Sequence, residues 1–306
     1  MSRRVLVIGL DGITFDTFDP WMEEGVLPSM KQFRSEGVHA SLDSIFPPIT
    51  APAWVSFMTG MNPGKTGIFE FLYFLKSSFD VTPVNASVRD GHPIWNILTT
   101  EGKKSMVFGV PVTYPPDKVD GYCISGFLTP KGARDFTHPP DLIDRIEAKH
   151  GPFPLYHKEV YQKGKVDLVL DEAFHHIQYK REMTKELLRE REWDFAITYF
   201  EGTDRLQHEV WHIHDETHPH SSPKERERYG ERVRDFYREV DRTVKELTEE
   251  FSDENTTVVI MSDHGFGPIH NYMNFNVWLL EQGLLVLKRD VFTQLKKMIF
   301  KLGITP

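Results

Sequence analysis

The sequence predicts an α/β protein with a mostly parallel central sheet, and two observations lead to this fold class. Short, mostly apolar runs with the length of a strand occur at 5–10, 193–200 and 258–261. The first and last are continuous enough to predict strands buried on both faces. Longer stretches with the apolar period of a helix separate these runs. Because alternating strands and helices form parallel sheets covered on both faces, we expect three layers, α/β/α.

The composition is that of a globular protein with one large core, since 40% of the 306 residues are hydrophobic and 26% are charged. The formal charge is −9 and no long basic block occurs, which disfavours a polymeric nucleic acid as partner. A small phosphorylated substrate, attracted through bound cations, fits this charge. No apolar run approaches the roughly 20 residues of a transmembrane segment. With one cysteine and no secretory signal, we expect a cytoplasmic protein, and the oligomeric state is unknown.

The N-terminal elements start with the strand over 5–10, which stops at Asp11. The apolar spacing over 16–37 predicts short helices that return across the sheet. Residues 39–45 alternate between apolar and polar side chains, which predicts a further strand.

Thr50 lies in a proline-rich stretch over 46–53. The prolines exclude a helix through residue 50, whereas one can resume over 53–59 because proline is tolerated in a first turn. A hydroxyl just ahead of that helix lies close to free N–H groups, which suits phosphate chemistry. Alternatively, Thr50 serves only as an N-cap.

The middle of the chain contains a predicted strand at 105–110 and a helix over 167–192 that leads into the strand at 193–200. Between them, residues 122–165 are rich in proline, glycine and charge and show little periodicity. Long irregular segments in compact domains are usually functional covers, so we expect a lid or insertion over 122–165.

Asp204 and His208 follow the strand at 193–200. Their spacing of four residues places both on one face of a helix. Four further histidines follow within twelve residues, but we expect these to be solvated, and only His208 is kept as a candidate ligand.

Asp263 and His264 end the apolar run at 258–261. A carboxylate beside an imidazole at a strand end can hold a metal ion or move a proton. Alternatively, the aspartate caps the next segment and the histidine lies on the surface. An amphipathic helix over 226–251 precedes this run, and a helix and strand over 274–287 and a basic amphipathic helix over 288–302 follow it.

Several candidate ligands follow strands, and a parallel sheet would bring them to one edge. They are Asp11, Asp204, His208, Asp263 and His264. Mixed carboxylate and imidazole ligands suit zinc, with manganese as the alternative. Two divalent ions about 4 Å apart can clamp a phosphoryl group and lower the pKa of a hydroxyl. Thr50 offers the hydroxyl, which metal coordination can activate.

The order of these motifs resembles the type I phosphodiesterase/nucleotide pyrophosphatase family of the alkaline phosphatase superfamily. The resemblance covers about residues 4–285. It implies one alkaline-phosphatase-like catalytic domain over 1–306. It rests on Asp11-Gly12, on Thr50 ahead of Thr59-Gly60, on Asp204-x-x-x-His208 and on Ser262-Asp263-His264-Gly265.

The resemblance further implies a site with two zinc ions and a threonine nucleophile. Thr50 would form a covalent phospho-enzyme intermediate, from which water releases the product. By position, Asp11, Thr50, Asp263 and His264 correspond to the ligands of one ion, and Asp204 and His208 to two ligands of the other.

The sequence departs from the family pattern at two points. The family completes its second metal site with a histidine well downstream of Asp263, and His270 lies too near to match. We therefore expect either that the chain is C-terminally truncated, that the second site is incomplete, or that another group substitutes. The family's nucleotide pyrophosphatases also carry an asparagine where this chain has Phe71, which puts nucleotide specificity in question.

The function that we expect is a metal-dependent phosphodiesterase or phosphohydrolase that cleaves a small phosphorylated substrate. One alternative is a phosphomutase or phosphotransferase of the same superfamily, although those relatives usually carry serine where this chain has Thr50. The other alternative is a non-catalytic form that binds metal or phosphate and lacks the last ligand.

Overall fold

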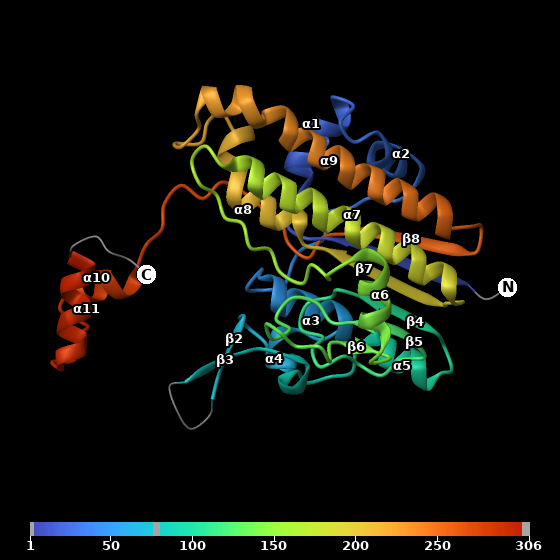
Figure 1. The fold of residues 1–306 in the computed structure, drawn as a ribbon, viewed down its shortest axis with the longest axis horizontal. Helices are drawn as coiled ribbons and strands as arrows, with labels where there is room; N and C mark the ends of the chain where they lie inside the picture. The colour runs from blue at the N-terminus through green and yellow to red at the C-terminus, as the bar shows by residue number, and fades with distance from the viewer. Residues whose placement is uncertain (1–2, 76–79, 302–306) are drawn as a thin grey trace. The chain divides into compact units, whose positions relative to one another are not determined.

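A computed structural model describes residues 3–75 and 80–301 of the chain (Figure 1). The sequence predicted a single domain over 1–306. The structure groups the residues up to Gly267 into one compact unit and those from Pro268 on into a second, and the single catalytic domain stays a prediction from the sequence. Among the described residues, none of the helices combines the length and apolar character needed to cross a membrane.

A six-stranded, mostly parallel sheet forms the centre of the first unit, as the sequence predicted. Its order is β6-β5-β4-β7-β1-β8, and only β6 runs antiparallel to its neighbour. The strands are Arg4–Leu10 (β1), Ser105–Phe108 (β4), Gly121–Ile124 (β5), Thr137–His138 (β6), Phe195–Phe200 (β7) and Thr256–Met261 (β8). A separate antiparallel hairpin pairs Leu72–Phe74 (β2) with Val81–Pro83 (β3).

Helices cover both faces of the sheet (Figure 1). Those of the first unit are Phe15–Glu23 (α1), Pro28–Glu36 (α2), Thr50–Thr59 (α3), Pro63–Thr66 (α4), Ile94–Thr100 (α5), Leu142–His150 (α6), Val166–Glu190 (α7), Gly202–His214 (α8) and Pro223–Phe251 (α9), with a 3₁₀ turn at Ala86–Val88. The second unit contains Phe275–Glu281 (α10) and Val291–Lys301 (α11).

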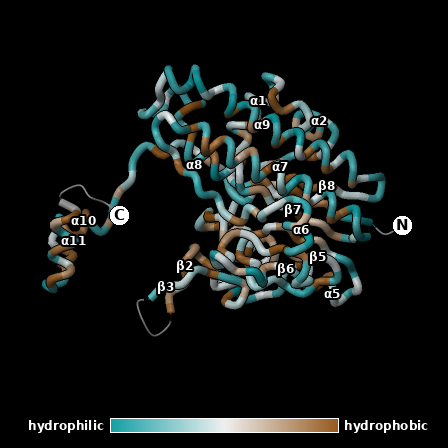
Figure 2. Tube along the Cα trace, viewed as in Figure 1, coloured by the Kyte–Doolittle hydropathy of each residue, from teal (hydrophilic) through white to brown (hydrophobic). Residues whose placement is uncertain are grey.

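Side chains that alternate along the strands divide the core into two layers. Leu6 and Ile8 of β1 pack in one cluster with apolar residues of α1, α6, α7, α8 and α9. Val7, which points to the other face, packs with residues of α3 and α5. In Figure 2 the long α9 is mostly hydrophilic with hydrophobic residues recurring along it, as expected of a helix with one buried face. The predicted three-layer α/β/α architecture is therefore confirmed.

One predicted strand is absent, and the predicted burial of another was wrong, for the same physical reason. Residues 39–45 form no strand, and side chains such as Leu42 are exposed. β8 was expected to be buried on both faces, yet it lies at the sheet edge and most of its residues are only half-buried. An apolar pattern describes which side chains suit burial, but it does not tell whether a partner strand is present.

Other boundaries shifted. α3 begins at Thr50, three residues earlier than predicted, because Pro52 falls within its first turn, where no backbone donor is needed. The predicted lid over 122–165 starts inside the central sheet, since it includes most of β5, all of β6 and α6. Strands this short show no clear period among prolines and glycines. The helices within 274–287 and 288–302 are present as α10 and α11, whereas the strand after α10 is absent from the described residues.

Candidate active site

The parallel register of three strands brings distant acidic residues to one edge of the sheet. Leu10 of β1 pairs with Phe200 of β7, and Gly9 pairs with Met261 of β8. The segments that follow these strands therefore leave the sheet side by side. They carry Asp11, the start of α8 with Asp204, and Asp263 with His264.

Thr50 joins these residues from the other side of the sheet edge. It is the first residue of α3, and only 9% of its surface is exposed. Its Oγ1 lies 3.1 Å from Nε2 of His264. The N-cap residue Ile49 offers no side-chain acceptor to the first turn. The positive end of the α3 dipole therefore faces the cluster without a protein cap.

His264 is the centre of the cluster. Its Nε2 lies 3.3 Å from Oδ1 of Asp11 and 3.5 Å from Oδ2 of Asp263. The structure therefore brings together the four residues that the resemblance assigns to one ion, namely Asp11, Thr50, Asp263 and His264.

Asp204 links this cluster to the second predicted pair. One ligand atom each from Asp11, Asp204 and His264 lie within 4.8 Å of one another. Asp204 Oδ2 is also 3.4 Å from Nε2 of His208, one helical turn further along α8. The His208 side chain is 46% exposed, and its ring packs edge-on against Phe266 at 4.7 Å. His208 therefore borders the cluster through Asp204 and does not contribute to the group of three.

The carboxylates of the cluster are buried without enough partners. Oδ1 of Asp11, Oδ1 of Asp204 and both side-chain oxygens of Asp263 have no hydrogen-bond partner. Burial raises the pKa of all three carboxyls, and at Asp11 the neighbouring carboxylates raise it further. Burying anionic oxygens without hydrogen-bond donors costs free energy, and a bound divalent cation would offset this cost by neutralising their charge. The donor set of carboxylates, imidazole and hydroxyl fits such an ion.

Polar residues that sequence reasoning missed hold the cluster in place. Tyr199 donates its phenolic hydrogen to Oδ2 of Asp11, and Thr203 donates to the Asp11 carbonyl at 2.6 Å. Gln207 Nε2 donates to the carbonyl of Gly12 at 2.8 Å. A signal for Tyr199 existed in the sequence, because a tyrosine at the end of a buried strand needs a partner for its hydroxyl.

The loop around Asp263 is fixed in a similar way. Ser44 Oγ donates to the Asp263 carbonyl at 2.6 Å. Ser262 Oγ accepts from the N–H of Ile13 at 2.9 Å and donates to the carbonyl of His264 at 2.7 Å. Sequence reasoning included Ser262 only as part of a motif and gave no role to Ser44.

Gly12 is required where β1 leaves the sheet. Its φ is +66°, in the left-handed region that favours glycine. A Cβ at this position would lie 2.8 Å from Oδ1 of Asp204. The close approach of the β1 and α8 segments therefore depends on a residue without a side chain.

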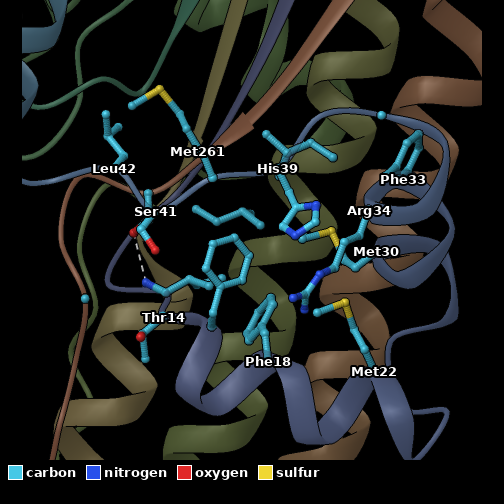
Figure 3. A pocket seen from close by; sticks show the side chains of 18 of the residues that line it. Thr14, Phe18, Met22, Met30, Phe33, Arg34, His39, Ser41, Leu42 and Met261 are labelled. Atoms are coloured by element: carbon cyan, nitrogen blue, oxygen red, sulfur yellow. Dashed lines mark hydrogen bonds between the residues drawn. The ribbon is translucent and has the colours of Figure 1, made fainter.

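A cavity of about 520 Å³ lies beside the cluster, between α1, α2, the segment at 37–42 and the edge of β8. Figure 3 shows its mostly apolar walls, with Phe18, Met30 and Leu42 facing the space and Arg34 and His39 on one side. His264 and Gly265 also line it, so the polar cluster borders this cavity.

One of the histidines beyond His208, His214, differs from the prediction that these residues are solvated. His214 packs edge-on against Trp21 and Trp211, at 5.6 and 4.5 Å between ring centroids. Burial lowers its pKa to about 4. Its position at the end of α8 explains the difference, because the helix places it beside the two tryptophans before the loop begins.

A mostly parallel sheet between two helical layers, with acidic residues and an imidazole at the carboxyl edge, is the architecture of alkaline-phosphatase-like proteins. The chain belongs to the type I phosphodiesterase/nucleotide pyrophosphatase family, whose sequence model matches residues 5–302. The resemblance inferred from the motifs is thus confirmed. Among proteins with curated descriptions, none matches the chain.

Solved structures show the same fold. Phosphonoacetate hydrolase from Sinorhizobium meliloti 1021, in complex with phosphonoformate, has a TM-score of 0.64 and 19% identity. The match covers 91% of this chain and 62% of the hydrolase. A murine ectonucleotide pyrophosphatase/phosphodiesterase 5, in an inactive form with AMP, has a TM-score of 0.51 and 18% identity over 86% of this chain and 57% of that one. The chain thus spans less than two thirds of either relative.

Proposed function

We propose that this chain carries the catalytic core of a metal-dependent phosphodiesterase or phosphohydrolase that acts on a small phosphorylated substrate. One observation carries the proposal. The Thr50 hydroxyl lies at the uncapped N-terminus of α3, 3.1 Å from His264 and beside buried carboxylates that lack donors. The ligands named for the solved relatives, phosphonoformate and AMP, are also small phosphorylated or phosphonate compounds.

The group of Asp11, Asp204 and His264 fits a divalent metal ion, and we propose that the site holds two such ions, zinc or alternatively manganese. Asp11, Thr50, Asp263 and His264 would hold one ion, and Asp204 and His208 would contribute to the other. When bound, such ions screen the charge of a phosphoryl group and lower the pKa of a coordinated hydroxyl.

Thr50 would act as the nucleophile. The Thr50 hydroxyl loses its proton as Oγ forms a bond to phosphorus, the bond from phosphorus to the leaving oxygen breaks, and the leaving oxygen takes up a proton. The free N–H groups of the first turn of α3 face the phosphoryl oxygens and stabilise their charge. Water then attacks the phosphothreonine, which releases the product and restores the hydroxyl.

The test is product analysis with zinc-loaded protein and a nitrophenyl phosphodiester or phosphomonoester, with and without an added acceptor alcohol. We expect diester turnover that yields nitrophenol and a free phosphomonoester. Transfer of the phosphoryl group to the alcohol would support the phosphotransferase alternative. Absence of turnover despite bound zinc would support the non-catalytic alternative. Cytoplasmic location stays a prediction from the sequence.

A further inference from the structure

A second cluster of titratable side chains lies outside the candidate active site. It joins the segment at 151–165, helix α7 and the residue between β7 and α8. Its members are His157, Glu172, His176, Lys180 and Glu201. None of them has a role in the proposed hydrolysis, although Glu201 lies three residues before Asp204.

Two imidazoles and one carboxylate of this cluster offer ligand atoms to a common point. Glu201 Oε1 lies 3.7 Å from Nε2 of His157 and 3.4 Å from Nδ1 of His176. Ligand atoms of the three residues lie within 4.8 Å of one another. Two atoms bound to zinc at about 2.1 Å in tetrahedral geometry are about 3.4 Å apart, so the spacing suits this ion.

His157 is held in the orientation of a metal ligand. Its Nδ1 faces Oε2 of Glu172 at 3.5 Å, and that carboxylate is fixed by the N–H groups of Lys158 and Glu159, at 2.8 and 3.0 Å. An Nδ1–H directed at a carboxylate leaves the lone pair on Nε2, as is usual for histidines that bind zinc. Nε2 is buried without a hydrogen-bond partner, and the side chain is only 8% exposed.

Glu201 is arranged to present one oxygen. Lys180 donates to its Oε2, which leaves Oε1 directed at the two imidazoles. With both imidazoles neutral, two carboxylates and one ammonium leave this buried cluster with a net negative charge. A divalent cation would offset that charge. Burial lowers the pKa of His176, which favours the neutral form that binds metals.

The two rings stack on each other, with centroids 3.8 Å apart and planes at 24°. The nitrogen lone pair of an imidazole lies in the plane of its ring, so the lone pairs of two stacked rings are nearly parallel. Both rings can bind one ion only if one of them tilts. Metal binding should therefore separate the stacked pair.

From this geometry we propose that His157, His176 and Glu201 form a third zinc site, with water as the fourth ligand. The ion would tie the segment at 151–165 to α7 and to the start of α8. The proposal is independent of the proposed hydrolysis, because none of its ligands belongs to the candidate active site.

The experiment measures zinc bound per chain after metal-free protein is incubated with zinc chloride and gel-filtered. Wild type is compared with His157→Ala and Glu201→Gln, and the matched control is His175→Ala, an exposed neighbour of His176 on α7. We expect wild type and the control to hold one more zinc ion per chain than the two site variants. The visible spectrum of cobalt-loaded protein should lose the bands of this site in the same two variants.

Glu201→Gln retains the side-chain shape and an acceptor for Lys180, so it tests the site even if His157→Ala does not fold. Circular dichroism identifies a variant that has not folded. Equal zinc content in wild type and in a folded site variant would overturn the proposal and leave the cluster as an ion-pair network around Glu201.

Discussion

Replacing Gly12 with alanine tests whether the close approach of β1 and α8 builds the metal-binding cluster. Gly12 has a φ of +66°, and an added Cβ would lie 2.8 Å from Oδ1, 3.0 Å from Cβ and 3.2 Å from Cα of Asp204. Gly25 is a matched control, because its φ is +78° and an added Cβ there would meet nothing within 4 Å. Both variants strain the backbone, and only Gly12→Ala displaces a candidate ligand.

The expected effects separate accordingly. An alanine in the left-handed conformation destabilises the folded state by about 1–2 kcal/mol. It also lowers the conformational entropy of the unfolded chain, which stabilises the folded state by about 0.4–1 kcal/mol. Gly25→Ala should therefore lose about 1 kcal/mol of stability. In Gly12→Ala, the Asp204 oxygen must move by about 0.6 Å to regain the 3.4 Å of an ordinary contact, and the nearby Cα limits that movement. A shift approaching 1 Å in a positioned group can cost about 100-fold in rate.

The assays are zinc titration of metal-free protein and turnover of the nitrophenyl phosphodiester, with urea unfolding as the check on stability. Gly12→Ala should lower zinc affinity and turnover by about 10–100-fold. Gly25→Ala should leave both unchanged while it shows the stability loss. Wild-type zinc affinity and turnover in folded Gly12→Ala would refute the inference that the spacing of Gly12 and Asp204 matters to the site.

Three further predictions concern single side chains. Tyr199→Phe removes the donor to Asp11, so calorimetry should show zinc affinity lower by about 10–100-fold, and an unchanged affinity would contradict the supporting role. Asp263→Asn should reduce the zinc content at the candidate active site, and wild-type content by elemental analysis would count against the assignment of this ligand. Burial lowers the pKa of His214 from 6.5 in the unfolded chain to about 4 in the folded protein. The folded state is therefore favoured above pH 6.5 and loses free energy of unfolding as the pH falls from 6.5 to about 4. Urea unfolding should show a loss of up to about 3 kcal/mol in wild type, and an equal loss in His214→Gln would contradict this explanation.

The fold class followed from local patterns because apolar runs and helical periods record burial. The runs at 5–10 and 193–200 became central strands for this reason. Burial patterns do not record pairing, however. The alternating segment at 39–45 remained unpaired, and β8 at the sheet edge had the same apolar character as a central strand. β5 and β6 were not predicted, because strands of so few residues show no alternation of apolar and polar side chains.

The candidate site could be predicted because its members follow strands, and parallel strands end at one edge. Asp11 and Asp263 came together in this way, and Thr50 was a candidate because its hydroxyl lies just ahead of a predicted helix. The supporting hydrogen bonds of Tyr199 and Ser44 could not be predicted, because they depend on side-chain positions across distant segments. The second histidine cluster was missed for the same reason, since His157 and Glu201 are far apart in sequence.

The central claim, that Thr50 receives the phosphoryl group, can be tested by trapping the intermediate. Zinc-loaded protein would be mixed with bis(4-nitrophenyl) phosphate, quenched in acid during turnover, and digested for mass spectrometry, with Thr50→Ala as control. The account predicts a nitrophenyl phosphate group on Thr50 in wild type and none in the variant, which should also lose turnover. Turnover without any modification of Thr50, or undiminished turnover by folded Thr50→Ala, would contradict it.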